Sequence, residues 1–404
     1  MLLPKLKIVY IIYGDLKNKT GNIIHALEIT KAWAKQGHIV TLIIPKFGIT
    51  TERIQANIIT IPTGFKGMLG LVIFSVLLTL YLMYLIIQKR VNIVYVMEMS
   101  FVFWAFLICK IAKIPYIIEV HAIAINEIKL QKSNYLKKYL KQLIMVLIEK
   151  LNFYNSDLII AVSEHIASFI HKFFNISKDK IVVISNGVDI HTYRPMNTLE
   201  CRKDLGIPLN AKVIGYIGSF FSYNHVDILV KIAPIILSII PNAYFVLVGN
   251  GPCRNEIEQI IKRKNLKNKF LIVDFVDSNL CAKYINTFDI GIGFHDPDYG
   301  GFPMKFLNYI ACGKPVVGTN SPGVQYISKY RLGILVDLKD IDQIIGAIVK
   351  LLLSNEYKTS EFICRSRKIV VKFYSWDAKA QEIIFQFLKL IKYQNKIGNN
   401  YETI

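Results

Sequence analysis

The sequence predicts an α/β protein with two doubly wound, Rossmann-like domains that face a cleft. Short apolar runs alternate with helical segments, which is typical of parallel sheets covered by helices on both faces. This alternation occurs twice, on either side of a polar stretch with two prolines at 194–211 that we interpret as a linker. At 404 residues the chain is also too long for one ordinary domain. We therefore expect an N-terminal domain at 1–195 and a C-terminal domain at 196–375.

The expected elements follow from the length and spacing of the apolar runs. In the first domain we expect strands at 8–13, 39–44, 93–96, 116–120, 158–162 and 181–184, and helices at 23–36, 68–89, 101–112, 135–154 and 164–173. In the second we expect strands at 213–217, 243–248, 270–273, 290–294, 316–319 and 333–336. Residues 376–404 are expected to form a helix that packs back on both domains, with a frayed tail after Lys396.

Composition limits the function classes. The net charge of +20 suits nucleic acid, an anionic membrane surface or acidic small molecules. The chain has no base-reading or base-stacking module, so we expect no nucleic-acid partner. The six cysteines lack metal-ligand or disulfide spacing, which argues for a reducing compartment and against a metal site. The N-terminal apolar run is too short for a signal peptide and is expected to be the first strand.

The uncharged run at 68–87 meets the length criterion for a transmembrane helix. A crossing would place strands of one parallel sheet on opposite sides of the bilayer, which makes a true span the least favoured of three interpretations. We expect a helix that packs on the sheet and dips partly into the membrane interface, with a fully buried helix as the alternative. A nearby helix has a basic side with Lys137, Lys138 and Lys141 and an apolar side, which also suits a membrane surface.

Residues 301–320 carry the most functional information. A glycine-containing loop leads into a helix predicted at 304–312, Gly313 stands at its end, and Pro315 precedes a buried strand. A helix N-terminus after such a loop offers free N–H groups and the positive end of a dipole to an anion. Lys305 adds a full charge in the first turn, which is unfavourable unless a negative ligand binds there. This arrangement indicates a phosphate site, although an ordinary surface lysine would give the same pattern.

Several motifs resemble those of the family 4 retaining glycosyltransferases. The segment Gly301-Phe302-Pro303 through Val317 resembles the family's donor-binding motif, E-G-F-P-x-x-x-x-E-x-x-A-x-G-x-P-V-V. Further matches follow the family's order along nearly the whole chain: Gly21-Asn22, the run from Ile118 to His121, Ala161 to Glu164, Ser185 to Asp189, Arg194-Pro195, Gly215 to Asp227, Val248 to Pro252, and Tyr374 to Trp376. The resemblance implies the GT-B fold and a metal-independent enzyme with no cofactor, which uses a nucleotide sugar as substrate.

The resemblance also implies roles for single residues. His121 would contact the donor sugar near the reacting carbon, Gly21 and Lys305 would meet the diphosphate, and Asn308 would meet the ribose. The remaining donor-binding candidates lie in the matching loops: Asn22, Ser219, Asn224, His225, Gly249, Gly251, Gly301, Phe302 and Pro303. From chemistry alone, His121 suits an active site because it ends a predicted strand, where clefts form. Ser163 and Asn186 are expected to be structural, as a helix N-cap and a turn residue.

Four positions depart from the family pattern. Ser219 and Asn224 replace two cations that usually follow the first strand of the second domain, although one branch of the family also has Ser at the first. Gly300 and Asn308 stand where the donor motif usually has acids. An amide accepts a ribose hydroxyl more weakly than a carboxylate does. Lys305, assisted by His225, is left as the cation for the phosphates.

We therefore predict a retaining hexosyltransferase that acts in polysaccharide biosynthesis. Its acceptor would be lipid-linked or a glycan, and it would be peripheral on the cytoplasmic face of the cell membrane. One alternative is a non-catalytic relative that binds a glycan or a partner, which the four departures would allow. Another is a sugar-nucleotide epimerase of the same architecture, which the motifs at 185–189 and 374–376 fit less well.

Overall fold

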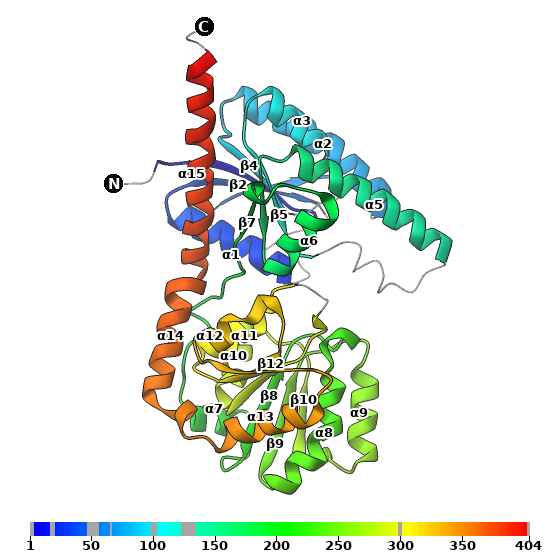
Figure 1. Cartoon of the computed structure of the whole chain (residues 1–404), viewed down its shortest axis with the longest axis vertical. Helices are drawn as coiled ribbons and strands as arrows, with labels where there is room; N and C mark the ends of the chain where they lie inside the picture. Colours follow the sequence, from blue (N-terminus) through cyan, green and yellow to red (C-terminus); the bar gives the residue numbers. More distant parts are fainter. Residues whose placement is uncertain are drawn as a thin grey trace. The chain divides into compact units, whose positions relative to one another are not determined.

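The computed structural model describes residues 4–16, 21–46, 56–64, 67–97, 103–122, 135–297 and 301–401. Within these ranges, side chains are not described at 67, 68, 103, 135–138, 141 and 393–401. The chain forms two compact units, one of Met1–Asn186 with Trp376–Ile404 and the other of Gly187–Ser375. Each unit is a parallel sheet with helices around it, as Figure 1 shows. The predicted pair of doubly wound α/β folds is confirmed.

The first unit has a seven-stranded sheet in the order β3-β2-β1-β4-β5-β6-β7, and its strand pairs are parallel. Its strands are β1 (Lys7–Ile11), β2 (Ile39–Pro45), β3 (Asn57–Ile61), β4 (Ile93–Met97), β5 (Tyr116–Val120), β6 (Leu158–Ala161) and β7 (Ile181–Val183). Every residue of β4, β5 and β6 is buried, as expected for strands covered on both faces.

The helices of this unit are α1 (Gly21–Lys35), α2 (Gly67–Ile87), α3 (Phe103–Ile111), α5 (Tyr135–Asn155), α6 (Glu164–Phe174) and α15 (Trp376–Tyr401). Parallel crossovers are right-handed, so α1 lies on one face of the sheet and α2, α3, α5 and α6 lie on the other. Helix α15 packs along α1, while α2 contacts α3 and α3 contacts α5 (Figure 1). Ser163 caps α6 by accepting a bond from the Ile166 N–H at 3.2 Å, as predicted.

The second unit has a six-stranded parallel sheet in the order β10-β9-β8-β11-β12-β13. Its strands are β8 (Lys212–Ile217), β9 (Ala243–Val248), β10 (Phe270–Val273), β11 (Ile290–Gly293), β12 (Val316–Thr319) and β13 (Gly333–Val336). Its helices are α7 (Thr198–Asp204), α8 (Val226–Ile239), α9 (Arg254–Arg263), α10 (Ser278–Thr287), α11 (Met304–Ala311), α12 (Tyr326–Lys329), α13 (Ile341–Leu353) and α14 (Ser360–Tyr374). Gly313 follows α11 with a φ of +73°, which fits its predicted place at the helix end.

Two stretches of secondary structure differ from the sequence-based expectation. The strand β3 was not predicted, because its residues Asn57–Ile61 are only partly buried and lack a continuous apolar run. Helix α15 continues to Tyr401, past Lys396, where the sequence suggests a frayed tail.

The two units divide between Asn186 and Gly187, so the predicted boundary at 195 falls inside the second unit. Val188 pairs with Ser375, and the Arg367 guanidinium donates to the Ile190 and Tyr193 carbonyls. These bonds hold 188–193 against α14.

The segment at 194–211, predicted as a linker, also belongs to the second unit and contains α7. Its Arg202 is buried and pairs with Asp289 at 2.9 Å, and it also donates to the Thr287 carbonyl. A buried charge needs such partners, and they fix this stretch to its own domain.

Helix α15 completes the core of the first unit although it lies at the other end of the sequence. The ring of Phe387 is fully buried and lies 5.6 Å from that of Trp33 on α1 and 5.5 Å from that of Tyr95 on β4. The indole of Trp33 also donates to the Ala380 carbonyl. The N-terminal sheet therefore depends on the C-terminal helix for one of its covering layers.

We expect Phe387→Ala to lower the free energy of unfolding of the first unit by about 3–5 kcal/mol, because it leaves a cavity among large rings. Phe385 lies two residues earlier on the same helix and is 65% exposed, so Phe385→Ala should change stability by less than about 0.5 kcal/mol. Urea unfolding followed by tryptophan fluorescence measures both. Equal effects of the two variants would contradict the assignment of α15 to this core.

Candidate active site

Each sheet has a point where its strand order reverses, between β1 and β4 in the first unit and between β8 and β11 in the second. Ligands of doubly wound folds bind beyond the carboxyl ends of the strands at such points. The predicted site residues follow the carboxyl ends of strands in both sheets: Gly21 and Asn22 follow β1, His121 follows β5, and the others follow β8, β9 and β11. The second unit holds most of the donor-binding candidates.

Helix α11 is set deeply against the second sheet at its reversal point. The Tyr309 hydroxyl accepts a bond from the Ile217 N–H at 2.8 Å and donates to the Ile292 carbonyl at 3.1 Å. It thereby satisfies backbone groups of β8 and β11, the two strands that meet there. Glycines make room for the helix: a Cβ at Gly291 would lie 2.4 Å from the Tyr309 ring, and one at Gly293 would lie 2.3 Å from the Phe306 ring.

This placement holds Lys305 in the first turn of α11 above the end of β8. Its Nζ donates to the Tyr216 hydroxyl at 3.2 Å and to Asn224 Oδ1 at 3.1 Å, and it lies 4.6 Å from the centre of the Tyr216 ring. Among the described residues, no carboxylate lies within salt-bridge distance of this ammonium group. Within the described part of the chain, the lysine is therefore held by neutral acceptors and a ring face and has no carboxylate to compensate its charge.

Burial lowers the pKa of Lys305 to about 7. His295 lies in the same region and shows the same effect, since burial and then the charge of Lys305 lower its pKa to about 4. The charge of His225 contributes in the same direction. The site thus brings together groups that an anion would favour in their protonated forms.

Three glycines allow the neighbouring loops to approach each other closely. Gly218 follows β8 with a φ of +135°, and a Cβ there would lie 3.5 Å from Lys305 Nζ. Gly249 follows β9 with a φ of +148°, and its Cβ would lie 1.8 Å from the Gly218 carbonyl oxygen. A Cβ at Gly251 would lie 2.7 Å from the Phe220 nitrogen. The predicted glycine loop at 249–251 is therefore packed directly against the Gly218 loop, beside the lysine.

Ser219 and Asn224, which replace two cations of the family pattern, form hydrogen bonds within this site. Asn224 is buried and donates to the carbonyl of Ser219 at 2.9 Å and to its hydroxyl at 3.1 Å, while its oxygen accepts from Lys305. Ser219 and Asn224 thus shape the loop and orient the lysine. His225 has left-handed backbone angles and precedes α8 without capping it through its side chain.

The remaining donor-motif residues surround the start of α11. Pro303 is the N-cap residue of the helix, Phe302 is buried and stacks on Tyr326 with ring centroids 5.7 Å apart, and Gly301 is partly exposed. Asn308 lies three residues after Lys305, on the same side of the helix, and is partly exposed. Gly300 lies outside the described residues.

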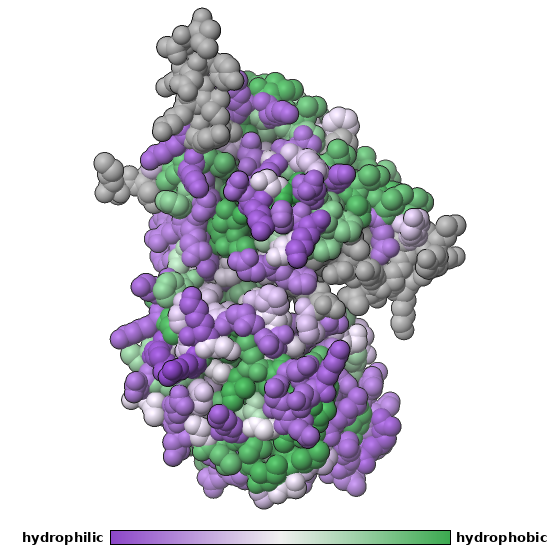
Figure 2. Space-filling model, viewed as in Figure 1, coloured by the Kyte–Doolittle hydropathy of each residue, from purple (hydrophilic) through white to green (hydrophobic). Residues whose placement is uncertain are grey.

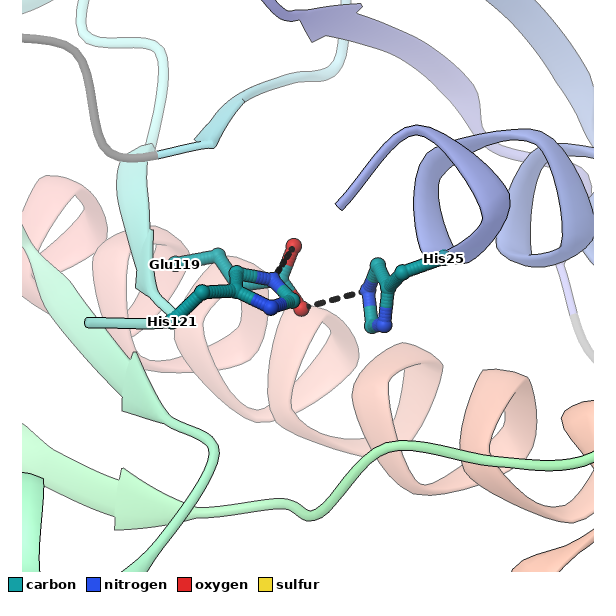
Figure 3. Close-up of side chains that lie close together, drawn as sticks. All are labelled: His25, Glu119 and His121. Carbon is teal, nitrogen blue, oxygen red and sulfur yellow. Dashed lines mark ion pairs between the residues drawn. The ribbon is translucent and has the colours of Figure 1, made fainter. Parts of the chain in front are cut away.

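The first unit holds His121 at the end of β5, as predicted, together with two residues that we did not predict. The Glu119 carboxylate lies between two imidazoles (Figure 3): its Oε1 is 2.7 Å from His25 Nε2, and its Oε2 is 3.3 Å from His121 Nε2. The Tyr10 hydroxyl donates to Oε2 at 2.9 Å. Burial would raise the pKa of Glu119, but His25 and His121 hold it well below its usual range.

Among the described residues, His25, Glu119 and His121 form a group that could hold a metal ion, since their ligand atoms lie within 4.8 Å of one another. Zinc binds imidazole nitrogen at about 2.0–2.1 Å, which separates tetrahedral ligand atoms by about 3.3 Å. The 2.7 Å contact between His25 and Glu119 is shorter and is a normal length for a charge-assisted hydrogen bond. The group is therefore spaced as an ion-pair cluster, in which Nε2 of both histidines and Oε1 of Glu119 have no hydrogen-bond partner in the described ranges.

The structure does not bring all predicted diphosphate contacts together within one unit. Gly21 and Asn22 are exposed at the start of α1 in the first unit, whereas Lys305 belongs to the second. Sequence reasoning missed Tyr216 and His295, which stand in or beside apolar strands without a distinguishing pattern. Glu119 did carry a signal, because a single acid in the apolar run Tyr116–Val120 must have a partner when buried.

Two family models match most of the chain, that of glycosyltransferase family 4 at residues 23–192 and that of glycosyl transferases group 1 at residues 197–368. An uncharacterized glycosyltransferase of Methanocaldococcus jannaschii is 27% identical over 58% of this chain and 61% of its own length. The UDP-Gal:alpha-D-GlcNAc-diphosphoundecaprenol alpha-1,3-galactosyltransferase of Escherichia coli is 29% identical over 42% of this chain and 45% of its own length. The matches thus span roughly half of these relatives.

Solved structures share the fold over almost the whole chain. HepE of Anabaena, in complex with UDP and glucose, superposes with a TM-score of 0.74 at 16% identity and covers 95% of this chain and 100% of its own. At this level of identity the likeness establishes the two-domain GT-B fold.

The glycine packing gives a test of the loop geometry. We expect Gly249→Ala to lower the melting temperature of the second unit, because its methyl group would collide with the Gly218 carbonyl oxygen. Gly346, exposed within α13, has no atom within 4 Å of a built Cβ, so Gly346→Ala should stabilise the unit by up to about 1 kcal/mol. Calorimetry measures both variants, and a harmless Gly249→Ala would refute the packing.

Proposed function

Because this chain belongs to glycosyltransferase family 4, we propose that it transfers a hexose from a nucleoside-diphosphate sugar, with retention and without a metal ion or cofactor. The observation that carries the proposal is the uncompensated Lys305 at the N-terminus of α11, beside the loops of Gly218 and Gly249. A diphosphate would supply the missing negative charge, and the helix N-terminus would add free N–H groups. Asn308, on the same side of α11, would then accept from the ribose.

We take a uridine donor and a lipid-linked or glycan acceptor as the first choice. HepE is solved with UDP and glucose, and the E. coli relative is named for a UDP-galactose donor and a diphosphoundecaprenol-linked acceptor. Incubation with UDP-sugars and such an acceptor in the presence of EDTA, followed by mass spectrometry and NMR of the product, tests the reaction and its stereochemistry. Binding of UDP without transfer would favour the non-catalytic alternative.

We further propose that the enzyme works at the inner face of the cell membrane, in polysaccharide biosynthesis, through one face of the first unit. This apolar face consists of exposed side chains on α2, α3 and α5: Leu69, Val72, Val76, Leu80, Met83, Tyr84, Ile87, Trp104, Leu107, Ile111, Tyr139, Leu140, Leu143, Ile144, Leu147, Leu151 and Tyr154. Figure 2 shows hydrophobic surface gathered over these helices. A contiguous apolar surface of this extent marks a partner or a membrane.

Charge favours the membrane. The sequences of α2 and α3 contain no acidic residue, and α5 contains one, Glu149, which is buried. Exposed basic side chains lie on or next to these helices, such as Lys89, Lys110 and Lys150. An apolar surface bordered by cations matches an anionic bilayer. The predicted lysine contacts at 137, 138 and 141 lie outside the described side chains.

Helix α2 is long and apolar enough to cross a membrane by length and composition, with one third of its most apolar window buried. Phe74, Leu78, Leu82 and Leu85 form its buried side. It connects β3 to β4, two strands of the same sheet, so its two ends stay with one folded unit. This supports a helix that lies on the membrane surface with its exposed side in contact with lipid.

For the phosphate assignment, we expect Lys305→Met to weaken UDP binding about 10- to 100-fold, the loss of a charge-assisted bond. Because the pKa of the free lysine is lowered to about 7, a bound diphosphate should raise it again. The wild type should therefore take up protons on binding near pH 7, and its affinity should fall as the pH rises above that value. Titration calorimetry in buffers of different ionisation enthalpy measures this uptake. Equal uptake in Lys305→Met would refute the assignment.

For the membrane face, we expect the double variant Leu80→Glu, Leu147→Glu to bind vesicles of phosphatidylglycerol and phosphatidylcholine at least 10-fold more weakly than the wild type, since it puts charges where lipid contact is proposed. The matched control is Ile235→Glu, Phe275→Glu, which adds the same charge at exposed apolar positions of the second unit. Sedimentation with vesicles measures both. An equal loss in the control would show that net charge alone drives binding.

A further inference from the structure

The buried cluster around Glu119 is held by two ion pairs. A carboxylate has no proton to give, so it favours a proton on the nitrogens that face its oxygens, Nε2 of His25 at 2.7 Å and Nε2 of His121 at 3.3 Å (Figure 3), although neither contact has hydrogen-bond geometry. The Tyr10 hydroxyl donates a hydrogen bond to the carboxylate at 2.9 Å. In a neutral histidine only one ring nitrogen carries a proton, so the contact with Glu119 decides the tautomer of His121.

The carboxylate is itself held from several sides. His25, on α1, is fixed by Asn186, whose amide lies 2.8 Å from Nδ1, and its ring meets the Trp376 ring edge-on at 5.1 Å. Tyr10, on β1, packs against Trp33 with ring centroids 5.8 Å apart. Glu119 therefore has no freedom to turn away from His121.

The three members of the cluster differ in exposure. Glu119 and His25 are 1% and 2% exposed, whereas His121 is 8% exposed and stands at the end of the strand. His121 is thus the member that can meet a ligand, and the other two lie behind it.

We propose that Glu119 is a positioning residue: its carboxylate keeps the proton of neutral His121 on Nε2, so that His121 meets the donor sugar with the lone pair of Nδ1. The inference rests on the proposed function, in which His121 contacts the hexose. Burial lowers the pKa of His121, which keeps the ring neutral and the lone pair free. The ring then accepts a hydrogen bond from a sugar hydroxyl, and its orientation is set before the donor binds.

The tautomer can be observed without any activity measurement. We expect long-range ¹H–¹⁵N spectra of the full chain, labelled with ¹⁵N-histidine and assigned with His121→Gln, to show His121 protonated at Nε2. A proton at Nδ1 would overturn the proposal. So would a stoichiometric divalent metal found by elemental analysis of the purified protein, because a metal held by Nε2 would exclude that proton.

Kinetics with two variants of Glu119 then test the consequence. Glu119→Ala should lower kcat about 10- to 100-fold, because the His121 ring loses its orientation. The KM for the donor should change less than about threefold, because the site keeps its affinity for the donor. Glu119→Gln should keep most of the kcat, since the amide oxygen can still accept from His121 and Tyr10. The amide N–H₂ then donates to Nε2 of His25, whose proton moves to Nδ1 and is donated to Asn186 Oδ1. Equal losses in both variants would overturn the proposal, since they would assign the effect to the charge of Glu119.

Asp157 supplies a matched control at the opposite end of β5, where it accepts from the Tyr116 N–H at 2.7 Å. Asp157→Asn should leave the His121 spectrum and kcat unchanged, even if it lowers the melting temperature. If Glu119→Ala fails to fold, the wild-type tautomer and Glu119→Gln still decide the matter. If the wild type transfers no sugar from any donor, the proposed function is refuted. The tautomer assignment is then tested by the spectra alone.

Discussion

The placement of α11 at the reversal point of the second sheet is the constraint on which the candidate site of the second unit depends. Strands β8 and β11 meet there, and the Tyr309 hydroxyl bonds to a backbone group of each. The helix can come this close because Gly291 and Gly293 present no side chain to the rings of Tyr309 and Phe306. The fixed helix sets the position of Lys305. The chain at Gly218 and Gly249 must then approach closely beside it, which only glycine allows at these two positions.

The two units differ in how a buried charge is compensated. In the first, the carboxylate of Glu119 lies within ion-pair distance of His25 and His121 and accepts a hydrogen bond from Tyr10, so its charge has partners without a ligand. In the second, Lys305 has neutral acceptors and a ring face, and its charged form is disfavoured. A complete cluster stabilises and orients, whereas an incomplete one gains free energy when a ligand of opposite charge arrives.

The sequence was sufficient for the fold because parallel strands buried on both faces leave a strong apolar signal. Five strands, including Tyr116–Val120 and Val316–Thr319, have the predicted bounds, and the partly buried β3 was missed. Site residues in glycine loops and at helix starts were found because those positions have their own local chemistry. His25 and Tyr216 were not found from the sequence. The role of a polar residue within an apolar face can be recognised only when its partner from a distant segment is known.

Ser219 and Asn224 show how the family pattern should be read in this chain. As replacements for two cations they suggested a weakened donor site. In the folded chain Asn224 ties the Ser219 loop together and offers its oxygen to Lys305 Nζ, so both residues serve the cation that remains. Several lysines and arginines placed close together in one site would repel one another, which costs free energy. A single lysine held by neutral partners avoids this repulsion. With these departures, the neutralisation of the proposed diphosphate falls to one side chain, Lys305. The N–H groups at the start of α11 would be its partners in that role.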